Sequence, residues 1–479
     1  MVAAVDVGTS VIKGGIFDRE GRPLSQSQSP VSFSSSSDSG NYEIDPGDWV
    51  ESLRRVFENL TFEKREVKAI VVSGNGPTLV PVDEGGHVLH PAIMWLDQRG
   101  IREAGAIIEE AGIPVDSSFF LSKAYWFYKF RPDIYEKTRF FLACPEYIDF
   151  YLCGQSSTIL PSSRFEQYVW NSDAIEALGM DRERFPPFVK PGADMGRLRK
   201  SVAKTLGLDE GTRVIAGGPD YIMSLVGTGT IEPGMTCDRA GTSEGINYCS
   251  KDPVHDRRLI SLPHILDDLF NIAGVISTTG KALEWFCGLS GLSRGSFMAD
   301  VESSEAGCGG VIFLPYLTGE RSPIWDPYAR GAFVGLTLGH GTKEMARAVV
   351  ESIGFAIRDI LEVMADNNLL MDDIRVAGSQ SQIEVLNQIK ADITGKRILI
   401  PTVAESELVG DACIGLVSLG EFESLHAACR QCVQIEREFT PDSRNLALYT
   451  EMFYIYRDIY SGLKDPFRRL TTSKNLEDT

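Results

Sequence analysis

Short apolar runs alternate with amphipathic stretches along the first half of the chain. Residues 2–7 (VAAVDV) and 11–18 (VIKGGIFD) predict two strands joined by a tight Gly-Thr-Ser turn. After Asp48, apolar positions recur at helical spacing over residues 49–60, and residues 68–76 form another apolar run that ends in glycine. Because strands and helices alternate, the pattern predicts an α/β fold built in layers.

A serine-rich segment interrupts this alternation. Residues 25–40 (SQSQSPVSFSSSSDSG) offer little apolar surface to bury, which is typical of a mobile or edge segment or of a plain surface loop. We favour the surface loop.

The pattern of the chain's beginning returns near its middle. Residues 213–220 (RVIAGGPD) predict a strand and residues 221–229 a helix. Residues 235–249 (MTCDRAGTSEGINYC) then repeat the order of extended run, Gly-Thr-Ser and extended run. Two such patterns half a chain apart suggest a duplicated domain, and we place the domains at residues 1–233 and 234–479.

The second half contains the clearest helix in the sequence. Apolar residues fall at three- and four-residue spacing from Lys343 to about residue 365, which predicts a helix with one buried face. A strand over residues 372–378, a helix over 383–395 and a strand over 397–401 follow. The alternation of the first half therefore recurs.

Composition narrows the class of protein. A chain of 479 residues exceeds one ordinary hydrophobic core. Its net charge of −19 repels phosphate backbones and anionic lipid, which argues against nucleic acid and membrane partners. The N-terminus lacks the features of a signal peptide, so the cytoplasm is the expected compartment. The nine scattered cysteines do not resemble a disulfide framework.

Phosphate groups are held by loops whose backbone N–H groups point inward, and small residues allow the close approach that this needs. Both Gly-Thr-Ser turns have this composition: they are Gly8-Thr9-Ser10 and Gly241-Thr242-Ser243. Either one alone is also typical of a plain hairpin. As a pair they could hold a triphosphate, with positive charge from Lys13 and a magnesium ion held through water by Asp6. The alternatives are that Asp6 caps its own turn and that Lys13 is a solvated lysine.

One further residue and one short cluster have chemistry that suits phosphoryl transfer to an alcohol. Asp220 follows an apolar strand and Pro219, so a helix N-terminus could hold it as the base for the attacking hydroxyl. An ordinary helix-capping aspartate is the alternative. Trp95, Asp97 and Arg99 combine an aromatic face with polar donors and acceptors, as sugar sites do, although a salt-bridged surface turn has the same composition.

In this order, the segments resemble the FGGY family of carbohydrate kinases over nearly the whole chain. The first half contributes DVGTSVIKGGIFD, which is similar to the family's first phosphate hairpin, YEIDPGDW, SGNGPTLVPVDEGG, and PAIMWLDQRG with its Trp-x-Asp-x-Arg motif. The middle and second half contribute GGPDYIMSLVGTGTIEPG, CDRAGTSEG, TTGKALEWF, PYLTGERSPIWDPYARGAFVGLTLGH and MARAVVESIGFAIRDI.

The resemblance implies an actin-like, ribonuclease-H-type fold in both domains, with a cleft between them that holds ATP and Mg²⁺ and closes to exclude water. It implies that Asp220 is the catalytic base and that the acceptor is a small-molecule sugar. Sugar-orienting residues would be Asn75, Trp95, Asp97, Arg99 and Asp220 itself. Nucleotide-binding residues would be the two Gly-Thr-Ser turns with Lys13, together with Gly280, Gly378, Ser379 and Gln380, the last three in place of the family's Gly-Gly-Ala loop.

Departures from the family pattern bear on the substrate. The Met-His-Gly of xylulokinases corresponds to Gly76-Pro77-Thr78, and the Arg-Glu pair of glycerol kinases is missing as well. The protein therefore binds a different sugar, or it recognises the same sugar through other side chains. A ketopentose such as xylulose is the first candidate, with a sugar acid, hexulose or polyol as alternatives. A non-catalytic protein that responds to sugar or ATP, or an actin-like ATPase, is the second class, and a homodimer is left open as the assembly.

Overall fold

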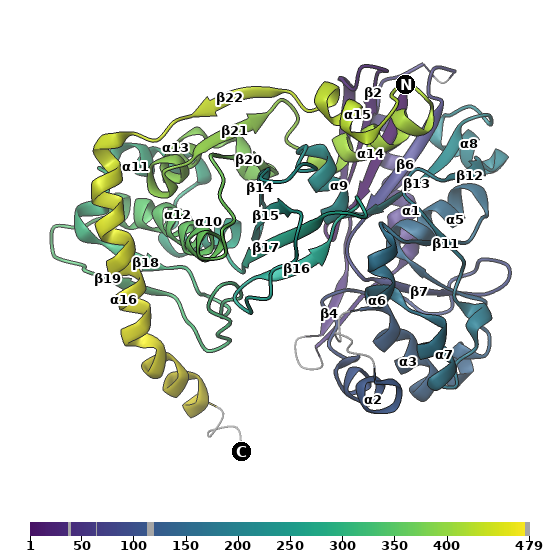
Figure 1. The fold of residues 1–479 in the computed structure, drawn as a ribbon, viewed down its shortest axis with the longest axis horizontal. Coiled ribbons are helices and arrows are strands. Elements are labelled where there is room, and N and C mark those ends of the chain that lie inside the picture. Colours follow the sequence, from purple (N-terminus) through teal and green to yellow (C-terminus); the bar gives the residue numbers. More distant parts are fainter. Residues whose placement is uncertain (37–39, 64, 113–118, 475–479) are drawn as a thin grey trace. The chain divides into compact units, whose positions relative to one another are not determined.

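The structure is a computed structural model that describes residues 1–36, 40–63, 65–112 and 119–474 (Figure 1). Its packing divides the chain into two compact units. Unit 1 comprises Met1–Gly229, Pro263–Asp267 and Ser406–Val433. Unit 2 comprises Thr230–Leu262, Asp268–Glu405 and Gln434–Thr479.

A six-stranded sheet forms the centre of unit 1, in the order β12-β13-β6-β1-β2-β3. Strands β1, β6 and β13 are parallel, whereas β2, β3 and β12 are antiparallel to their neighbours. The strands are β1 (Val2–Val7), β2 (Val11–Phe17), β3 (Pro23–Pro30), β6 (Ala69–Gly74), β12 (Asp194–Arg197) and β13 (Arg213–Pro219).

Unit 2 is built on a seven-stranded sheet in the order β16-β17-β15-β14-β20-β21-β22. The strands are β14 (Thr236–Ala240), β15 (Glu244–Ser250), β16 (Ile260–Pro263), β17 (Phe270–Ile276), β20 (Asp373–Ala377), β21 (Arg397–Pro401) and β22 (Ile435–Phe439). Strands β14, β20 and β21 are parallel, and β15, β17 and β22 are antiparallel to their neighbours.

The two sheets repeat one topology. The order β17-β15-β14-β20-β21-β22 has the same sequence of antiparallel and parallel neighbours as β3-β2-β1-β6-β13-β12. Each sheet thus begins with a three-stranded meander and continues with two parallel strands and one antiparallel strand. This is the ribonuclease-H-type arrangement, present twice, and it confirms the predicted actin-like fold class.

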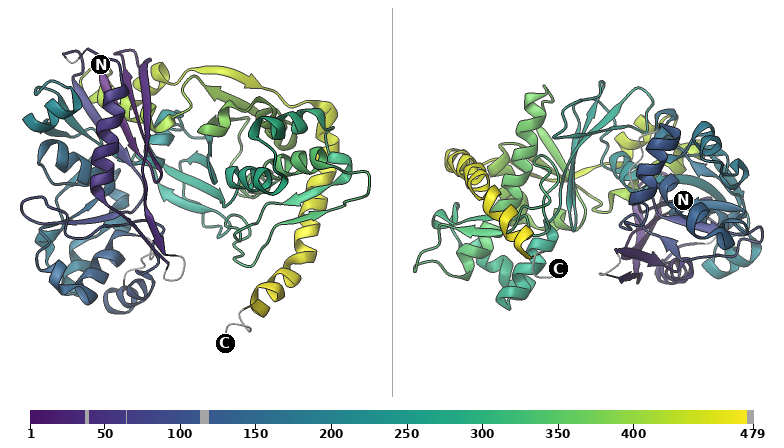
Figure 2. Two further views of the ribbon diagram at one scale, coloured as in Figure 1. Left: turned by 180° about the vertical axis from the view of Figure 1, so that it is seen from behind. Right: turned by 90° about the horizontal axis from the view of Figure 1, so that it is seen from below.

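Helices surround both sheets. Those of unit 1 include α1 (Pro46–Asn59), α2 (Ile101–Ala111), α3 (Phe120–Phe130), α5 (Cys144–Cys153), α8 (Lys200–Leu206), α9 (Asp220–Gly227), α14 (Ser406–Ser418) and α15 (Leu425–Cys432). Those of unit 2 include α10 (Gly280–Ser290), α11 (Arg294–Ser303), α12 (Thr342–Asp366), α13 (Glu384–Thr394) and α16 (Ser443–Lys474). Both views of Figure 2 show α16, in yellow, running along the other helices of unit 2. Its buried residues Tyr449, Phe453 and Tyr456 join the core of that unit.

The predicted strands and helices of the second half are present. The long amphipathic pattern forms α12, which ends at Asp366, and the patterns after it form β20, α13 and β21. The helix predicted after the strand at residues 213–220 is α9. None of the helices that the structure describes combines the length and the apolar character needed to cross a membrane.

Two local predictions need correction: the preferred surface loop at residues 25–40 was wrong, and the helix predicted after Asp48 is present but begins earlier. The serine-rich segment contains two strands, β3 and β4 (Ser34–Ser36), and residues 37–39 lie outside the described part of the chain. β3 is an edge strand that pairs with β2, so the side chains of Gln26 and Gln28 remain in water while its backbone extends the sheet. Helix α1 begins before Asp48, because the side chain of Asp45 accepts a hydrogen bond from the Gly47 N–H and caps it.

Helix α14 belongs to unit 1 although it lies far along the sequence. Figure 1 shows it, in yellow-green, beside the purple strands of the N-terminal sheet. Glycines allow α14 and α9 to touch backbone to backbone: a methyl group at Gly227 would overlap the carbonyl oxygen of Ser406, and one at Gly410 would overlap that of Met223. This contact fixes the helix that begins with Asp220.

The crossing of α9 and α14 generates a stability prediction. We expect Gly227→Ala to lower the free energy of unfolding by about 1–3 kcal/mol, because the methyl group forces the helices apart. Gly105→Ala, in α2 where no atom lies within 4 Å of the added methyl group, is the matched control and should be neutral or stabilising. Urea denaturation of both variants checks this, and equal effects would contradict it.

Candidate active site

Three parallel strands of unit 1 end at the same edge of the sheet, and each has a predicted site residue at its end. Asp6 on β1 pairs with Ser73 on β6, and Ser73 pairs with Gly218 on β13. Asn75 follows β6 directly, and Asp220 follows β13. The register of the sheet therefore brings Asp6, Asn75 and Asp220 to one place.

A buried thiol, Cys144 at the start of α5, lies among these residues. Its Sγ accepts a hydrogen bond from Nδ2 of Asn75 at 3.6 Å. Burial raises the pKa of the Cys144 thiol well above its usual range, and the charges of Asp6 and Asp220 raise it further. No sequence pattern marks Cys144 as part of the site.

Asn75 is buried and holds the strand ends together. Its backbone N–H donates to the Val7 carbonyl at 2.9 Å, and its Nδ2 donates to the same oxygen at 3.0 Å. Its Oδ1 accepts from the hydroxyl of Thr78 at 2.6 Å. These bonds occupy the amide, so in this conformation Asn75 supports the turn after β6.

The first Gly-Thr-Ser turn joins β1 to β2. The Gly8 N–H donates to the Val11 carbonyl at 3.1 Å, which closes the hairpin. Lys13 on β2 pairs directly with Asp6 on β1, so the two side chains stand on the same face of the sheet. Ser10, at the tip, is exposed, whereas Asp6 is buried.

Trp95 lies against this turn. Its Nε1 donates to Oγ1 of Thr9 at 3.1 Å, and a methyl group at Gly76 would lie 3.6 Å from the Trp95 Cβ. The side chain is 37% exposed, so part of the ring is open to solvent. Trp95, Thr9 and Gly76 therefore form one surface, next to the strand ends that carry the acids.

Asp97 and Arg99 pair with each other inside the protein. The Asp97 carboxylate accepts from Nε and Nη2 of Arg99 at 2.8 and 2.9 Å and from the Tyr42 N–H at 2.7 Å. Arg99 also donates to Glu43 at 2.6 Å and lies over the ring of Trp126. Their side chains are 0% and 8% exposed, so a direct contact with a sugar requires this network to open.

Lys123 on α3 is a buried residue that sequence patterns did not single out. Its ammonium donates to the carbonyl of Pro77, in the Gly76-Pro77-Thr78 segment that departs from the family pattern. A lysine in the aromatic stretch FLSKAYWFYKF is the only sequence signal that pointed to it. The contact fixes the segment on which Trp95 packs.

Seven of the predicted nucleotide-binding residues belong to unit 2, which has a cavity of about 250 Å³. Five of them line it: Gly241, Thr242, Gly280, Ser379 and Gln380. The remaining lining residues come from α10 and α11 and were not predicted: Leu283, Glu284, Cys287, Arg294, Phe297 and Met298. The first three share a face of α10 at three- and four-residue spacing, which is the signal in the sequence that could have identified them.

Backbone contacts bring the loops of this cavity together. The Gly280 N–H donates to the Gly241 carbonyl at 3.2 Å, and the Lys281 N–H donates to the Thr242 carbonyl at 3.3 Å. A methyl group at Gly280 would overlap the Gly241 carbonyl. Glycine is therefore required where the start of α10 meets the second Gly-Thr-Ser turn.

Ser243 and Gly378 do not line the cavity. The Ser243 carbonyl accepts from the Gly241 N–H at 3.1 Å and closes the turn. Gly378 has a φ of +89°, and its N–H donates to the Ala404 carbonyl at 2.8 Å. Both residues shape loops whose neighbours face the cavity.

The replacement of the family's third loop residue by Gln380 has a structural explanation. The side chain is 2% exposed and does not project into solvent. Its Nε2 donates to the Gly241 carbonyl at 2.5 Å and to Oγ1 of Thr279 at 3.3 Å. Gln380 thus ties three loops of the cavity together instead of blocking their approach.

Beneath the second hairpin lies a buried ionic cluster. Lys390 on α13 donates to Asp238 on β14 at 2.7 Å and to Glu244 on β15, and all three side chains are almost fully buried. Burial alone would lower the pKa of Lys390, but the attraction of the two carboxylates outweighs it, so the pKa is raised. The cluster connects both strands of the hairpin to the same helix.

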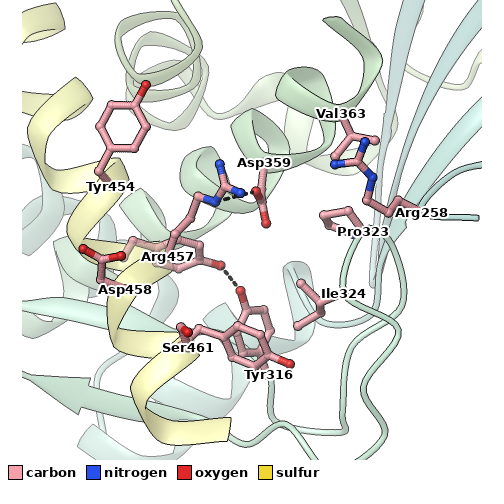
Figure 3. Close-up of a pocket in the computed structure, with 12 residues that line it drawn as sticks. Arg258, Tyr316, Pro323, Ile324, Asp359, Val363, Tyr454, Arg457, Asp458 and Ser461 are labelled. Carbon is pink, nitrogen blue, oxygen red and sulfur yellow. Dashed lines mark hydrogen bonds and ion pairs between the residues drawn. The ribbon is translucent and has the colours of Figure 1, made fainter. Parts of the chain in front are cut away.

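A larger cavity, of about 410 Å³, lies elsewhere in unit 2 and contains none of the predicted residues (Figure 3). Asp359 and Arg457, which both line it, form an ion pair with 3.5 Å between Oδ1 and Nε. Burial raises the pKa of Asp359 to about 6. The hydroxyls of Tyr316 and Tyr456 form a 2.5 Å hydrogen bond at its wall. Both arginines that line it, Arg258 and Arg457, already have carboxylate partners.

Over the described ranges, no group of three or more His, Cys, Asp or Glu side chains forms a metal cage. Magnesium in phosphoryl-transfer sites is usually held by one or two carboxylates and the phosphates of the substrate. The single carboxylate of Asp6 at the end of β1 fits that kind of site.

Comparison with known proteins establishes the family. The model of the FGGY N-terminal domain matches residues 1–227, and that of the FGGY C-terminal domain matches residues 239–419. The chain belongs to the FGGY family of carbohydrate kinases. It is a sugar kinase, and kinases of this family use ATP as the phosphoryl donor.

Similar proteins extend over the whole chain. A xylulose kinase of Bacillus subtilis is 27% identical, with 97% of each chain covered. A gluconokinase of the same species is 24% identical, covering 98% of this chain and 99% of its own. The crystal structure of a xylulose kinase from Lactobacillus acidophilus, 23% identical, has a TM-score of 0.84 and covers 98% of this chain and 100% of its own.

The position of Gln380 generates a binding prediction. We expect Gln380→Ala to weaken ADP binding about tenfold, because loss of a buried hydrogen bond leaves the Gly241 carbonyl without this donor and loosens the turn. Gln382→Ala is the matched control, since Gln382 pairs with Arg437 outside the cavity. Calorimetric titration with ADP checks this, and unchanged affinity in Gln380→Ala would refute the role.

Proposed function

We propose that this kinase phosphorylates a hydroxyl of a ketopentose such as xylulose, with Asp220 as the general base. The main support is the position of Asp220 at the first residue of α9, at the same sheet edge as Asp6, in a chain of the FGGY family. The full-length similarity to xylulose kinases supports the choice of acceptor.

Asp220 has the surroundings that a base for an alcohol needs. It is half-buried, and its Oδ1 accepts from the Tyr221 N–H at 2.6 Å at the start of the helix. Free N–H groups at a helix N-terminus stabilise an anionic side chain and hold it in one orientation. In the proposed reaction Asp220 accepts the proton of the acceptor hydroxyl while the hydroxyl oxygen attacks the terminal phosphorus of ATP.

The phosphate groups would be held by main chain rather than by many charges. We assign Gly8, Thr9 and Ser10 of unit 1 and Gly241, Thr242 and Ser243 of unit 2 to the phosphates, with Lys13 as the nearby cation. Gly280, Gly378, Ser379 and Gln380 are assigned to the rest of the nucleotide. Mg²⁺ held through water by Asp6 would offset phosphate charge.

The sugar would lie on the surface formed by Trp95, Thr9 and Gly76. The ring of Trp95 offers a face for the C–H groups of a sugar. Asn75, Asp97 and Arg99 would act mainly by fixing the loops around it, since their polar groups already have partners in the protein. Gly76-Pro77 has no polar side chain that could replace the family's histidine. The main-chain groups of this segment and Asp220 are therefore the candidates for hydrogen bonds to the sugar hydroxyls.

Loss of the base gives the first functional prediction. Asp220→Asn should lower turnover at least about a hundredfold, because the amide cannot accept the proton, while ADP affinity stays within about twofold of the unchanged chain. Steady-state turnover and ADP titration together check this. Turnover close to that of the unchanged chain would show that the base is another residue.

The Trp95 surface gives the second. Trp95→Ala should raise the KM for the sugar about tenfold through loss of ring contact, with little change in the KM for ATP. Trp95→Phe keeps an aromatic face and loses only the hydrogen bond to Thr9, so it should retain most of the sugar affinity. An equal rise in both KM values would point to a general loss of structure.

The acceptor is tested by a panel of ketoses, aldoses, polyols and sugar acids, with ADP release as the readout. The similarity to a gluconokinase makes a sugar acid the second candidate. Turnover that is highest with D-xylulose supports the proposal, and turnover that is highest with gluconate replaces the ketopentose with an aldonic acid. ADP release that no sugar increases would contradict sugar phosphorylation and favour an ATPase.

A further inference from the structure

Asp411, which no sequence motif singles out, lies behind the strand ends that carry Asp6 and Asp220. It is fully buried in the second turn of α14. Its Oδ2 accepts a hydrogen bond from the hydroxyl of Ser73 at 2.7 Å. Ser73 is the residue of β6 that pairs with Asp6 on one side and with Gly218 on the other. The carboxyl group of Asp411 is therefore attached to the middle strand of the three.

The other oxygen of Asp411 lies over an irregularity in β13. The pairing of β13 with β6 shifts register between Ala216 and Gly218. A methyl group at Gly217, the residue at this shift, would overlap the Val72 carbonyl and lie 3.1 Å from Oδ1 of Asp411. The carboxyl group thus packs on the bulge, three residues before Asp220.

The main chain of Asp411 is held as firmly as its side chain. Gly410, its neighbour, lies in the backbone contact between α14 and α9, where a methyl group would overlap the Met223 carbonyl. Helix α9 begins with Asp220. Asp411 consequently touches β6 and the bulge of β13 from a helix that is fixed against the helix of the base.

A buried acid at this position costs stability. Burial raises the pKa of Asp411 well above its usual range, opposed by the hydrogen bond from Ser73, and the charge of Asp6 raises it further. Oδ1 has no hydrogen-bond partner among the described residues. Apolar side chains of similar size usually stabilise a core better than such a group does. This cost argues that Asp411 has a role that packing alone would not require.

We propose that Asp411 is a positioning residue, which sets the distance between Asp6 and Asp220 through its contacts with Ser73 and the Gly217 bulge. The proposal rests on the function proposed for Asp220 and adds to it a residue that touches neither sugar nor nucleotide. An error of about 1 Å in the placement of a catalytic group can cost on the order of a hundredfold in rate. Precise support of the bulge therefore affects turnover more than binding.

Three variants test the proposal. Asp411→Ala should lower kcat at least about tenfold, because the bulge and Ser73 lose their support, while ADP affinity in unit 2 stays within about twofold. Asp411→Asn, which keeps the size and an acceptor for Ser73, should retain kcat within about threefold. Ser73→Ala, which removes one of the two contacts of Asp411, should lower kcat by no more than Asp411→Ala does. The double variant Ser73→Ala/Asp411→Ala should be no slower than Asp411→Ala, since Ser73 acts through Asp411.

Asp149→Ala is the matched control. Asp149 on α5 is equally buried in unit 1, and burial raises its pKa too, with Glu146 as its charged neighbour. Its removal should change the melting temperature without changing kcat per folded molecule. If Asp411→Ala behaves like Asp149→Ala, or if the effects of Ser73→Ala and Asp411→Ala simply multiply, the positioning role is overturned. If the unchanged chain shows no sugar-dependent turnover, the proposed function fails instead, which is a separate result.

Discussion

The parallel pairing of β1, β6 and β13 is the constraint on which the rest of unit 1 depends. Parallel strands end at the same edge of a sheet, so residues far apart in sequence meet there without contact between their own segments. Asp6, Asn75 and Asp220 are brought together in this way. The side chains around them hold their neighbours in place: Asn75 donates to the Val7 carbonyl, Lys123 donates to the Pro77 carbonyl, and Asp411 accepts from the Ser73 hydroxyl. Few groups are thus assigned a role in the proposed reaction, and many other side chains maintain the spacing between those few.

In unit 2, main-chain contacts hold the loops of the predicted nucleotide site together. Its Gly-Thr-Ser turn meets the start of α10 and the loop of Gln380, and glycines at positions 280 and 378 allow the backbones to approach. The buried Lys390 cluster anchors the two strands of the hairpin from below. The same sheet topology therefore carries a similar turn in both units, with different supports in each.

Periodicity and turn residues predicted most of the fold, because buried strands and one-sided helices leave a direct record in the sequence. The duplicated Gly-Thr-Ser turns and the long helix α12 are examples. Edge strand β3 was missed, since its Ser and Gln side chains show no apolar pattern and its backbone pairing with β2 is what reveals it. Within the site, residue types did not show which polar groups were already paired. Asp97 and Arg99 have the composition of a sugar site, and the structure shows that they bind each other. Asp411 and Cys144 depend on tertiary contacts over long sequence distances, which a single sequence does not encode in any local pattern.

The return of α14 to unit 1 has a consequence for synthesis on the ribosome. The side chains of Val2 and Val71 lie so close to Gly415 of α14 that a methyl group there would press on both, so this helix covers β1 and β6 of the central sheet. Until residues 406–433 have left the exit tunnel, the central sheet of unit 1 lacks that cover and its apolar face is open to other chains. Unit 1 is therefore completed only after residues 230–262 and 268–405 of unit 2 have been translated, and an N-terminal fragment cut at the middle of the sequence lacks this cover.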